Sequence, residues 1–181
     1  MYKSVDGGKT WKNTGLNDAH HIARVIISAS QPNVVFAAVM GHLYSPNTER
    51  GLYKSVDGGE SWKRVLFAND QTGVIDAWQD PKQPDVWYAA SWQRNRKAWN
   101  FEEGGNGTGL YKSINHGENW ELISNAASGL PIGQGAGRMG ISGSAQNSNL
   151  LYVVIDNQQI RQQQPGKSKS SLKPAQLRKM S

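Results

Sequence analysis

The sequence predicts an all-β fold, a partial β-propeller of four-stranded antiparallel blades. One short pattern occurs three times, at residues 2–11, 53–62 and 111–120, so successive copies start 51 and 58 residues apart. That interval is too long for a helix pair and fits a four-stranded blade. Runs of β-branched and aromatic residues, which favour strands, separate the copies.

Each copy is predicted to be a β-hairpin, because alternating residues flank a tight polar turn. In the second copy the turn is Asp57-Gly-Gly-Glu60, where the Asp carboxylate can accept backbone N–H bonds and Gly59 supplies a left-handed φ. Trp62 then places a large apolar surface under the hairpin. The equivalent residues of the three copies are Ser4, Asp6, Gly8 and Trp11; Ser55, Asp57, Gly59 and Trp62; and Ser113, Asn115, Gly117 and Trp120.

A second pattern lies between the hairpins and predicts two more strands per blade. Each β-branched or aromatic run leads through a short turn that contains Pro or Asn into another such run. These pairs supply strands A and B of a blade, and the hairpins supply strands C and D. The expected strands of these pairs are 24–28, 34–39, 73–77, 86–90, 139–142 and 150–155.

The strand count predicts an incomplete propeller over residues 1–157. Residues 22–67 and 72–124 are each expected to form a blade, while 1–16 and 137–157 form half-blades. Joining the halves gives three blades, fewer than the four to eight that propellers typically contain. We therefore expect this chain to be a fragment of a longer protein and to pack against the remaining blades of that protein.

Composition excludes several classes of function. The net charge is +6, yet residues 1–160 hold 14 basic and 14 acidic residues, and the surplus lies wholly beyond them. No basic stripe exists to neutralise phosphates, so nucleic-acid binding is not predicted. The polar, basic segment 158–181 is expected to be unstructured. No apolar run reaches the roughly 18 residues of a membrane span, and no cofactor is expected.

The repeated pattern resembles Ser-x-Asp-x-Gly-x-Thr-Trp, the Asp-box or BNR repeat. That repeat occurs in sialidases, sortilin-type (VPS10) propellers, xyloglucanase-like glycoside hydrolases and propellers of the photosystem II assembly-factor type. Over residues 1–157 the chain is most similar to large bacterial sortilin-like proteins that are often labelled glycosyl hydrolase. The resemblance implies structural roles for the box residues and a periplasmic or secreted location. It does not by itself fix a function.

Two long connections between strands B and C, 40–51 and 92–109, are the candidate binding loops, since loops longer than a turn requires often carry function. Flat aromatic side chains beside Arg and Glu suit a sugar ring or a peptide. In the alternative, the aromatics pack each loop onto its own blade, and Glu49 pairs with Arg50. The candidate ligand-contacting residues are Tyr44, Arg50, Trp92, Arg94, Arg96, Trp99, Phe101 and Glu102.

The histidines and the arginines at the start of strands A give weaker indications of a binding site. The spacing of His20, His21 and His42 indicates no metal site, which needs three or four converging ligands. Arg24 and Arg138 both start a strand A, where they either face an anionic group or occupy structurally equivalent places in the repeat.

Three functions remain open. A non-catalytic propeller that binds peptide or glycan on the B–C and D–A loop face is favoured, and a sialidase- or xyloglucanase-like glycoside hydrolase is the alternative. An assembly or scaffold propeller is third. Hydrolysis needs two carboxyl groups across the sugar, and the candidate acids match no catalytic motif. Those acids are Glu49, Asp70, Asp76, Glu102 and Glu103.

Overall fold

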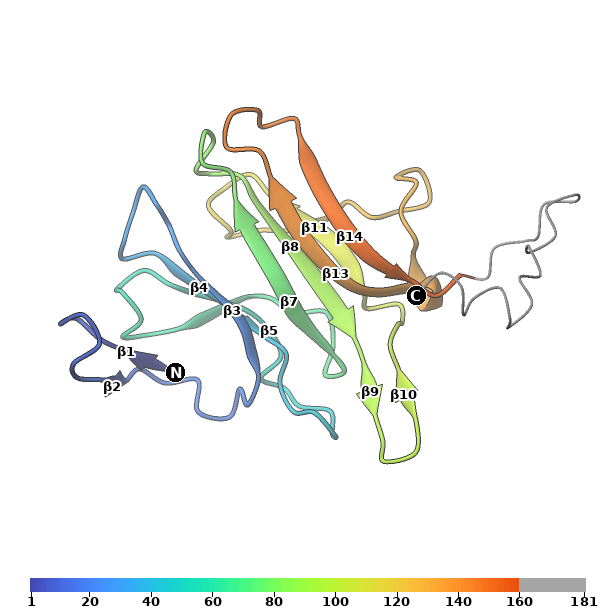
Figure 1. Cartoon of the computed structure of the whole chain (residues 1–181), viewed down its shortest axis with the longest axis horizontal. Helices are drawn as coiled ribbons and strands as arrows, with labels where there is room; N and C mark the ends of the chain where they lie inside the picture. Colours follow the sequence, from blue (N-terminus) through green and yellow to red (C-terminus); the bar gives the residue numbers. More distant parts are fainter. Residues whose placement is uncertain (160–181) are drawn as a thin grey trace, which may run out of the picture.

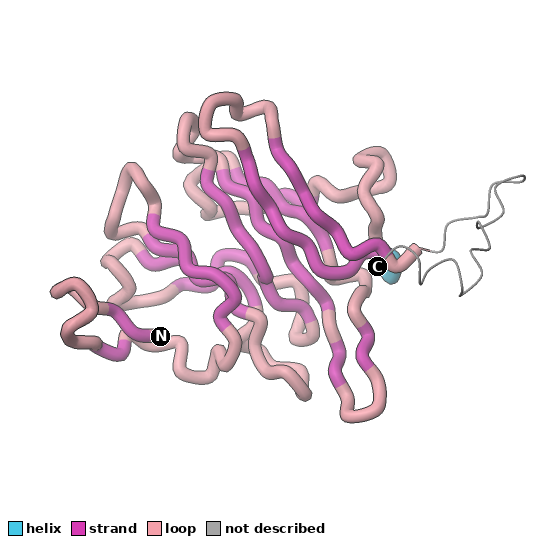
Figure 2. The backbone as a smooth tube through the Cα atoms, viewed as in Figure 1, coloured by secondary structure: helices cyan, strands magenta, loops and turns pink. Residues whose placement is uncertain are grey.

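The computed structural model describes residues 1–159, so segment 158–181 lies almost wholly outside the described residues. Within them the chain is nearly all β, and its one helical turn is the short η1, Gly133–Gly135 (Figures 1 and 2). The strands are β1 (Tyr2–Lys3), β2 (Lys12–Asn13), β3 (Ile22–Ile27), β4 (Val35–Val39), β5 (Gly51–Ser55), β6 (Lys63–Leu66), β7 (Thr72–Gln79), β8 (Trp87–Gln93), β9 (Asn95–Arg96), β10 (Phe101–Glu102), β11 (Gly109–Ser113), β12 (Glu121–Leu122), β13 (Ala136–Gly143) and β14 (Leu151–Asn157).

The strands form small antiparallel sheets, which confirms the predicted fold class. One four-stranded sheet has the order β3-β4-β5-β6, and the other has the order β7-β8-β11-β12. Pairs β1–β2 and β13–β14 form two-stranded sheets on either side of them. Figure 1 shows β3, β7 and β13 running side by side, and β3 and β13 both contact β7.

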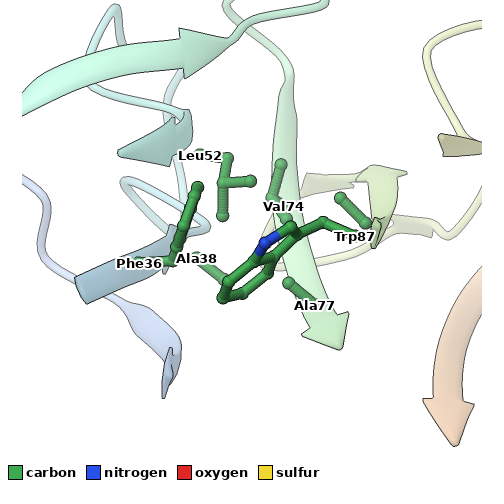
Figure 3. Close-up of a cluster of buried hydrophobic side chains, with 7 residues drawn as sticks. Phe36, Ala38, Leu52, Val74, Ala77 and Trp87 are labelled. Carbon is green, nitrogen blue, oxygen red and sulfur yellow. The ribbon is translucent and has the colours of Figure 1, made fainter. Parts of the chain in front are cut away.

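The core lies between successive sheets. Trp87 of β8 is almost fully buried, and its ring centroid lies 4.2 Å from that of Phe36 on β4. Val74 and Ala77 of β7 complete this contact between the two four-stranded sheets (Figure 3). A second cluster, around Met139, joins β7, β8 and β11 to β13 and β14. Because each sheet is apolar on both faces, the sheets stack as blades do.

An ion pair between a buried lysine and a partly exposed glutamate also joins the two four-stranded sheets. Lys54 of β5 donates to a carboxylate oxygen of Glu118 at 2.6 Å and to the carbonyl of His116 at 2.8 Å. The same carboxylate pairs with Lys63, and the hydrogen bond from Lys54 is the main reason why the pKa of Glu118 lies below its ordinary value. The hairpin of the second sheet therefore holds the first by charge as well as by packing.

The turns of the repeat hairpins (residues 2–13, 53–64 and 111–122) are closed by side chains. Ser55 Oγ accepts the Gly59 N–H at 2.7 Å and donates to Asp57 Oδ1 at 2.7 Å. That carboxylate in turn accepts the backbone N–H of Ser61 at 2.9 Å and its hydroxyl at 2.5 Å. Hydrogen bonds from Ser61, strongest from its hydroxyl, hold the pKa of Asp57 far below its usual range.

The first and third hairpins repeat this arrangement. Gly8 donates to Ser4 Oγ at 2.8 Å, and Gly117 donates to Ser113 Oγ at 3.0 Å. Asn115 replaces the carboxylate and still accepts the N–H of Asn119 at 3.0 Å. Gly8, Gly59 and Gly117 all have positive φ, as predicted, but the preceding residue does too, including His116 at φ 58°. The turn thus needs two left-handed residues.

The three hairpin tryptophans each lie against the equivalent glycine of their own turn, as expected, but they differ in exposure. Trp11 donates its indole N–H to the Gly8 carbonyl at 3.1 Å. Trp11 is 64% exposed, because β1 and β2 pair only with each other among the described strands. Trp62 is half-buried and donates its indole N–H to the Thr14 carbonyl at 2.8 Å, which ties the first sheet to the segment after β2. Trp120 donates to Gly117 of its own turn instead.

The connections divide between two ends of the sheets. At one end the repeat hairpins meet the turns between strands A and B, with Gly58 N–H bonded to the Asn33 carbonyl. At the other end the segment between β6 and β7 meets both long loops, through hydrogen bonds from the N–H groups of Asn47 and Arg94. Figure 1 shows both loops below the sheets, away from the hairpins. Residues 1–159 contain no helix long and apolar enough to cross a membrane.

Candidate functional site

The 92–109 segment is more ordered than the sequence indicated. Strand β8 continues to Gln93, and β9 and β10 then form a short hairpin in which Arg96 pairs with Phe101. Figure 1 shows this hairpin extending beyond the sheets. The N–H of Gln93 is bonded to the Thr108 hydroxyl at 2.9 Å, which closes the base of the loop. The sequence missed this hairpin because its strands have two residues each.

One predicted ligand-contacting residue, Trp92, is instead structural. It is 7% exposed, donates its indole N–H to the Glu103 carbonyl at 2.8 Å, and meets Phe101 edge-on. For Trp92, therefore, the alternative in which loop aromatics pack onto their own sheet is the correct one.

Other predicted residues are exposed on the same loop face. Trp99 at the hairpin tip is 84% exposed, and Tyr44 on the 40–51 loop is 68% exposed. Arg96 lies over the Phe101 ring at 4.8 Å, and Glu102 accepts a hydrogen bond from Asn95 at 3.0 Å. Exposed aromatic surface is therefore present on both loops, and the charged side chains lie on the 92–109 loop.

Arg50 does not pair with Glu49 and is nearly inaccessible. Its side chain is 1% exposed and donates from Nη2 to the carbonyls of His42, at 2.7 Å, and Ser45, at 3.0 Å. Glu49 accepts instead from the Tyr53 hydroxyl at 3.2 Å. The guanidinium of Arg50 therefore lies inside the 40–51 loop and fixes its shape.

Arg50 faces a second arginine across a small cavity. The cavity holds about 100 Å³ and is lined by Arg50, Arg94, Leu43, Ser45, Pro46, Gln71 and Asn95. Within residues 1–159, Nε and Nη1 of Arg50 and Nε and Nη2 of Arg94 are buried and have no hydrogen-bond partner. Arg94 also lies 5.5 Å from the centre of the Trp92 ring. Two guanidinium groups thus line one cavity, and each has N–H groups without a hydrogen-bond partner among the described residues.

The charges of three arginines act in sequence, Arg94 on Arg50 and Arg138 on Arg94, and these three residues are here called the arginine cluster. Burial, followed by the charge of Arg94, lowers the pKa of Arg50 to about 10, and Asp70 opposes this only in part. Burial and the charge of Arg138 lower the pKa of Arg94. Each shift means that its environment disfavours the cation. A bound anion would reverse that effect.

Arg24 and Arg138 occupy different environments, although both start an innermost strand. Arg24 forms an ion pair with Asp76 at 3.2 Å, and Asp76 also accepts the N–H of Ile141 at 2.8 Å. Asp76 therefore links β3, β7 and β13. Arg138, by contrast, is exposed beside Arg94.

Histidines from separate segments converge as well, which their spacing did not indicate. Asp18 and His20 precede β3, and His42 follows β4. One ligand atom from each lies within 4.8 Å of those of the other two.

No protein-family model matches the chain. The photosystem II assembly lipoprotein Ycf48 of Prochlorococcus marinus (strain MIT 9313) is 28% identical over 179 residues, covering 86% of this chain and 47% of the relative. The chain thus spans about half the length of this curated relative.

Two solved GH74 enzymes resemble the structure. An ancestral GH74 enzyme has a TM-score of 0.62 at 18% identity, covering 84% of this chain and 18% of that one. The Niastella koreensis GH74 enzyme has a TM-score of 0.59 at 20% identity, covering 84% and 21%. At these identities the likeness shows the fold alone.

Proposed function

We propose that this chain is part of a non-catalytic, sortilin-like Asp-box propeller that binds a carboxylate-bearing peptide segment on its B–C and D–A loop face. In this proposal residues 22–67 and 72–124 are blades, and 1–16 and 137–157 are halves of blades. The observation that carries it is the cavity between Arg50 and Arg94, where buried guanidinium donors have no partner among the described residues.

A carboxylate suits this cavity in charge and in shape. An unpartnered buried donor costs roughly 1–3 kcal/mol, and a planar guanidinium offers paired N–H groups that match the two oxygens of a carboxylate. The cavity volume of about 100 Å³ exceeds what one water needs, so a carboxylate has room between the two arginines.

The rest of the face suits an extended peptide. Trp99 and Tyr44 expose aromatic surface on two different loops, and Arg96 adds a cation on the protruding β9–β10 hairpin. Aromatic and Arg side chains carry much of the energy at protein interfaces. Anchoring an acidic side chain in the cavity would place the neighbouring peptide residues beside these groups.

Glycan binding and hydrolysis are the second candidate, because the neighbouring folds are GH74 enzymes. A glycosidase acid needs a raised pKa. The carboxyl groups whose pKa is clearly shifted, Asp6, Asp57, Glu60 and Glu118, are all lowered and belong to the hairpins at the opposite end. Asp76 on the inner strands is engaged by Arg24 and Ile141. These observations favour binding over catalysis.

The third function, an assembly propeller, would also have a protein as its partner. The similar protein is named a photosystem II assembly lipoprotein, and a propeller of that kind would present its loop face to a polypeptide. A lipoprotein relative also favours an extracytoplasmic location for this chain.

The test uses matched peptides, each made once with Asp or Glu and once with Asn or Gln, on an array followed by calorimetry with the full chain. We expect acid-specific binding that Arg94→Met weakens at least about tenfold and that Trp99→Ala and Arg96→Ala also weaken. Lys63→Ala, on the hairpin end, is the control and should bind as the unchanged chain does. Equal binding of acid and amide peptides, or an equal loss with Lys63→Ala, would refute the proposal.

A further inference from the structure

A cluster of Asp18, His20 and His42 lies outside the arginine cluster and plays no part in the proposed peptide site. Asp18 and His20 belong to the connection between β2 and β3, and His42 belongs to the 40–51 loop. His42 and Asp18, whose side chains are hydrogen-bonded, are 24 residues apart in the sequence. The fold therefore creates the cluster, and no sequence spacing reveals it.

The geometry places three metal-binding atoms around one point. Asp18 Oδ1 lies 3.2 Å from His42 Nε2 and 3.5 Å from His20 Nε2. The two imidazole rings lie 3.9 Å apart between centroids, at an interplanar angle of 31°. Bonds of about 2.0–2.2 Å from one ion to imidazole nitrogen and carboxylate oxygen imply ligand atoms a little over 3 Å apart. Small side-chain rotations are enough to reach that arrangement.

The ligands are oriented by neighbours in the way that metal ligands usually are. His42 Nδ1 lies 3.1 Å from Ser45 Oγ, so the ring can donate from Nδ1 to the hydroxyl and leave Nε2 free for a cation. The Arg50 guanidinium holds the carbonyls of His42 and Ser45, and Asn47 Nδ2 donates to the Asp18 carbonyl at 3.3 Å. Both ligand-bearing segments are thus fixed to each other before any ion binds.

We propose that Asp18, His20 and His42 form a binding site for a zinc-type divalent transition metal ion. Two imidazole nitrogens and one carboxylate oxygen are ligands that Zn²⁺ accepts, whereas Ca²⁺ and Mg²⁺ prefer oxygen alone. Asp18 and His20 are half or more exposed, at 66% and 51% of their side chains. A fourth position therefore opens to solvent and can hold water or a donor atom of a ligand.

The test is calorimetric titration of the full chain, stripped with a chelator, against Zn²⁺, with Co²⁺ absorption as a second readout. We expect one ion per chain and a tetrahedral Co²⁺ spectrum. Asp18→Asn, His20→Asn and His42→Ala should each weaken binding at least tenfold, and Ser45→Ala, which removes the orienting hydroxyl, should weaken it by about 10- to 100-fold. Asn at position 20 is chosen because it tolerates the left-handed φ of 49° found there.

The matched control is His116→Asn, which removes a histidine that also contacts a carboxylate, Asp85 at 3.1 Å, and also has a positive φ. It should bind Zn²⁺ as the unchanged chain does. Urea midpoints measured without metal identify any variant that is misfolded. If other variants are misfolded, the test rests on Asp18→Asn, which is nearly isosteric and changes an exposed residue. Binding that survives Asp18→Asn and His20→Asn together, or that His116→Asn removes, would overturn the proposal, as would Ca²⁺ competing equally with Zn²⁺.

Discussion

Replacing Arg94 with Met should leave the free protein as stable as before or more stable, although most changes of half-buried residues destabilise. Two nitrogens of its guanidinium are buried without a partner, and burial with the charge of Arg138 lowers its pKa. Removing one such orphaned donor relieves roughly 1–3 kcal/mol. The change also loses the cation–π contact with Trp92, worth roughly 0.5–2 kcal/mol. The two ranges together give a change in the free energy of unfolding of about −1 to +2.5 kcal/mol, whose midpoint is a gain.

The same change should weaken binding of an acidic peptide. A hydrogen bond to a charged group contributes roughly 1.5–3 kcal/mol, and each 1.4 kcal/mol is about tenfold in affinity. We therefore expect a loss of roughly 10- to 150-fold. A gain in stability together with a loss of affinity would identify Arg94 as a ligand-binding residue. Removing an arginine with a purely structural role would instead lower the free energy of unfolding.

Urea denaturation followed by tryptophan fluorescence measures the stability change. The control is Arg64→Met, because Arg64 has partners: it donates to the Thr48 carbonyl and lies 4.0 Å from the centre of the Phe67 ring. That control should lose about 1 kcal/mol. If Arg94→Met instead lowers the free energy of unfolding by 1 kcal/mol or more, Arg94 is structural and the reasoning fails.

The remaining predictions concern stability and use urea midpoints. Asp57→Ala should lower the midpoint more than Asp70→Ala, because only Asp57 closes a hairpin turn through its carboxylate; equal shifts would contradict this. The depressed pKa of Asp57 means that its contribution is present above the unfolded carboxyl pKa of about 3.9 and is lost as pH falls through the folded value. Asp57→Asn should therefore reduce the loss of stability between about pH 4 and pH 2. Trp87→Ala should cost about 3–5 kcal/mol, while Trp11→Ala, 64% exposed, should cost under about 1 kcal/mol.

Local patterns in the sequence predicted the hairpins because the interactions that form them are local. The Ser–Asp–Gly turn closes through hydrogen bonds spanning two to four residues, such as Gly59 N–H to Ser55 Oγ. The alternation of strand residues likewise needs only the chain itself. The expected strands 34–39 and 150–155 match β4 and β14 to within two residues at either end.

The environment of a repeated residue could not be predicted in this way, because it depends on the next sheet. Trp11, Trp62 and Trp120 occupy the same place in the pattern, yet Trp11 is exposed while the other two are half-buried. Trp62 bonds to the Thr14 carbonyl, whereas the other two bond to their own turns. Burial of Trp92 and Arg50 was missed because it depends on how each long loop folds back on itself. The fold of the chain could therefore be predicted from the sequence more fully than the environment of any single side chain.

The candidate sites were the least predictable part because they join segments that are distant in sequence. Arg50 precedes β5 of the first four-stranded sheet and Arg94 follows β8 of the second, and they meet where the 40–51 loop packs beside the end of β8. The repeat constrains the hairpin end of each sheet, whose turns need fixed residues, and leaves the opposite end free to differ. That freedom explains why orphaned cations and converging histidines occur at the loop end. Arg50 connects the two groups physically, since its guanidinium lines the cavity and holds the carbonyl of His42.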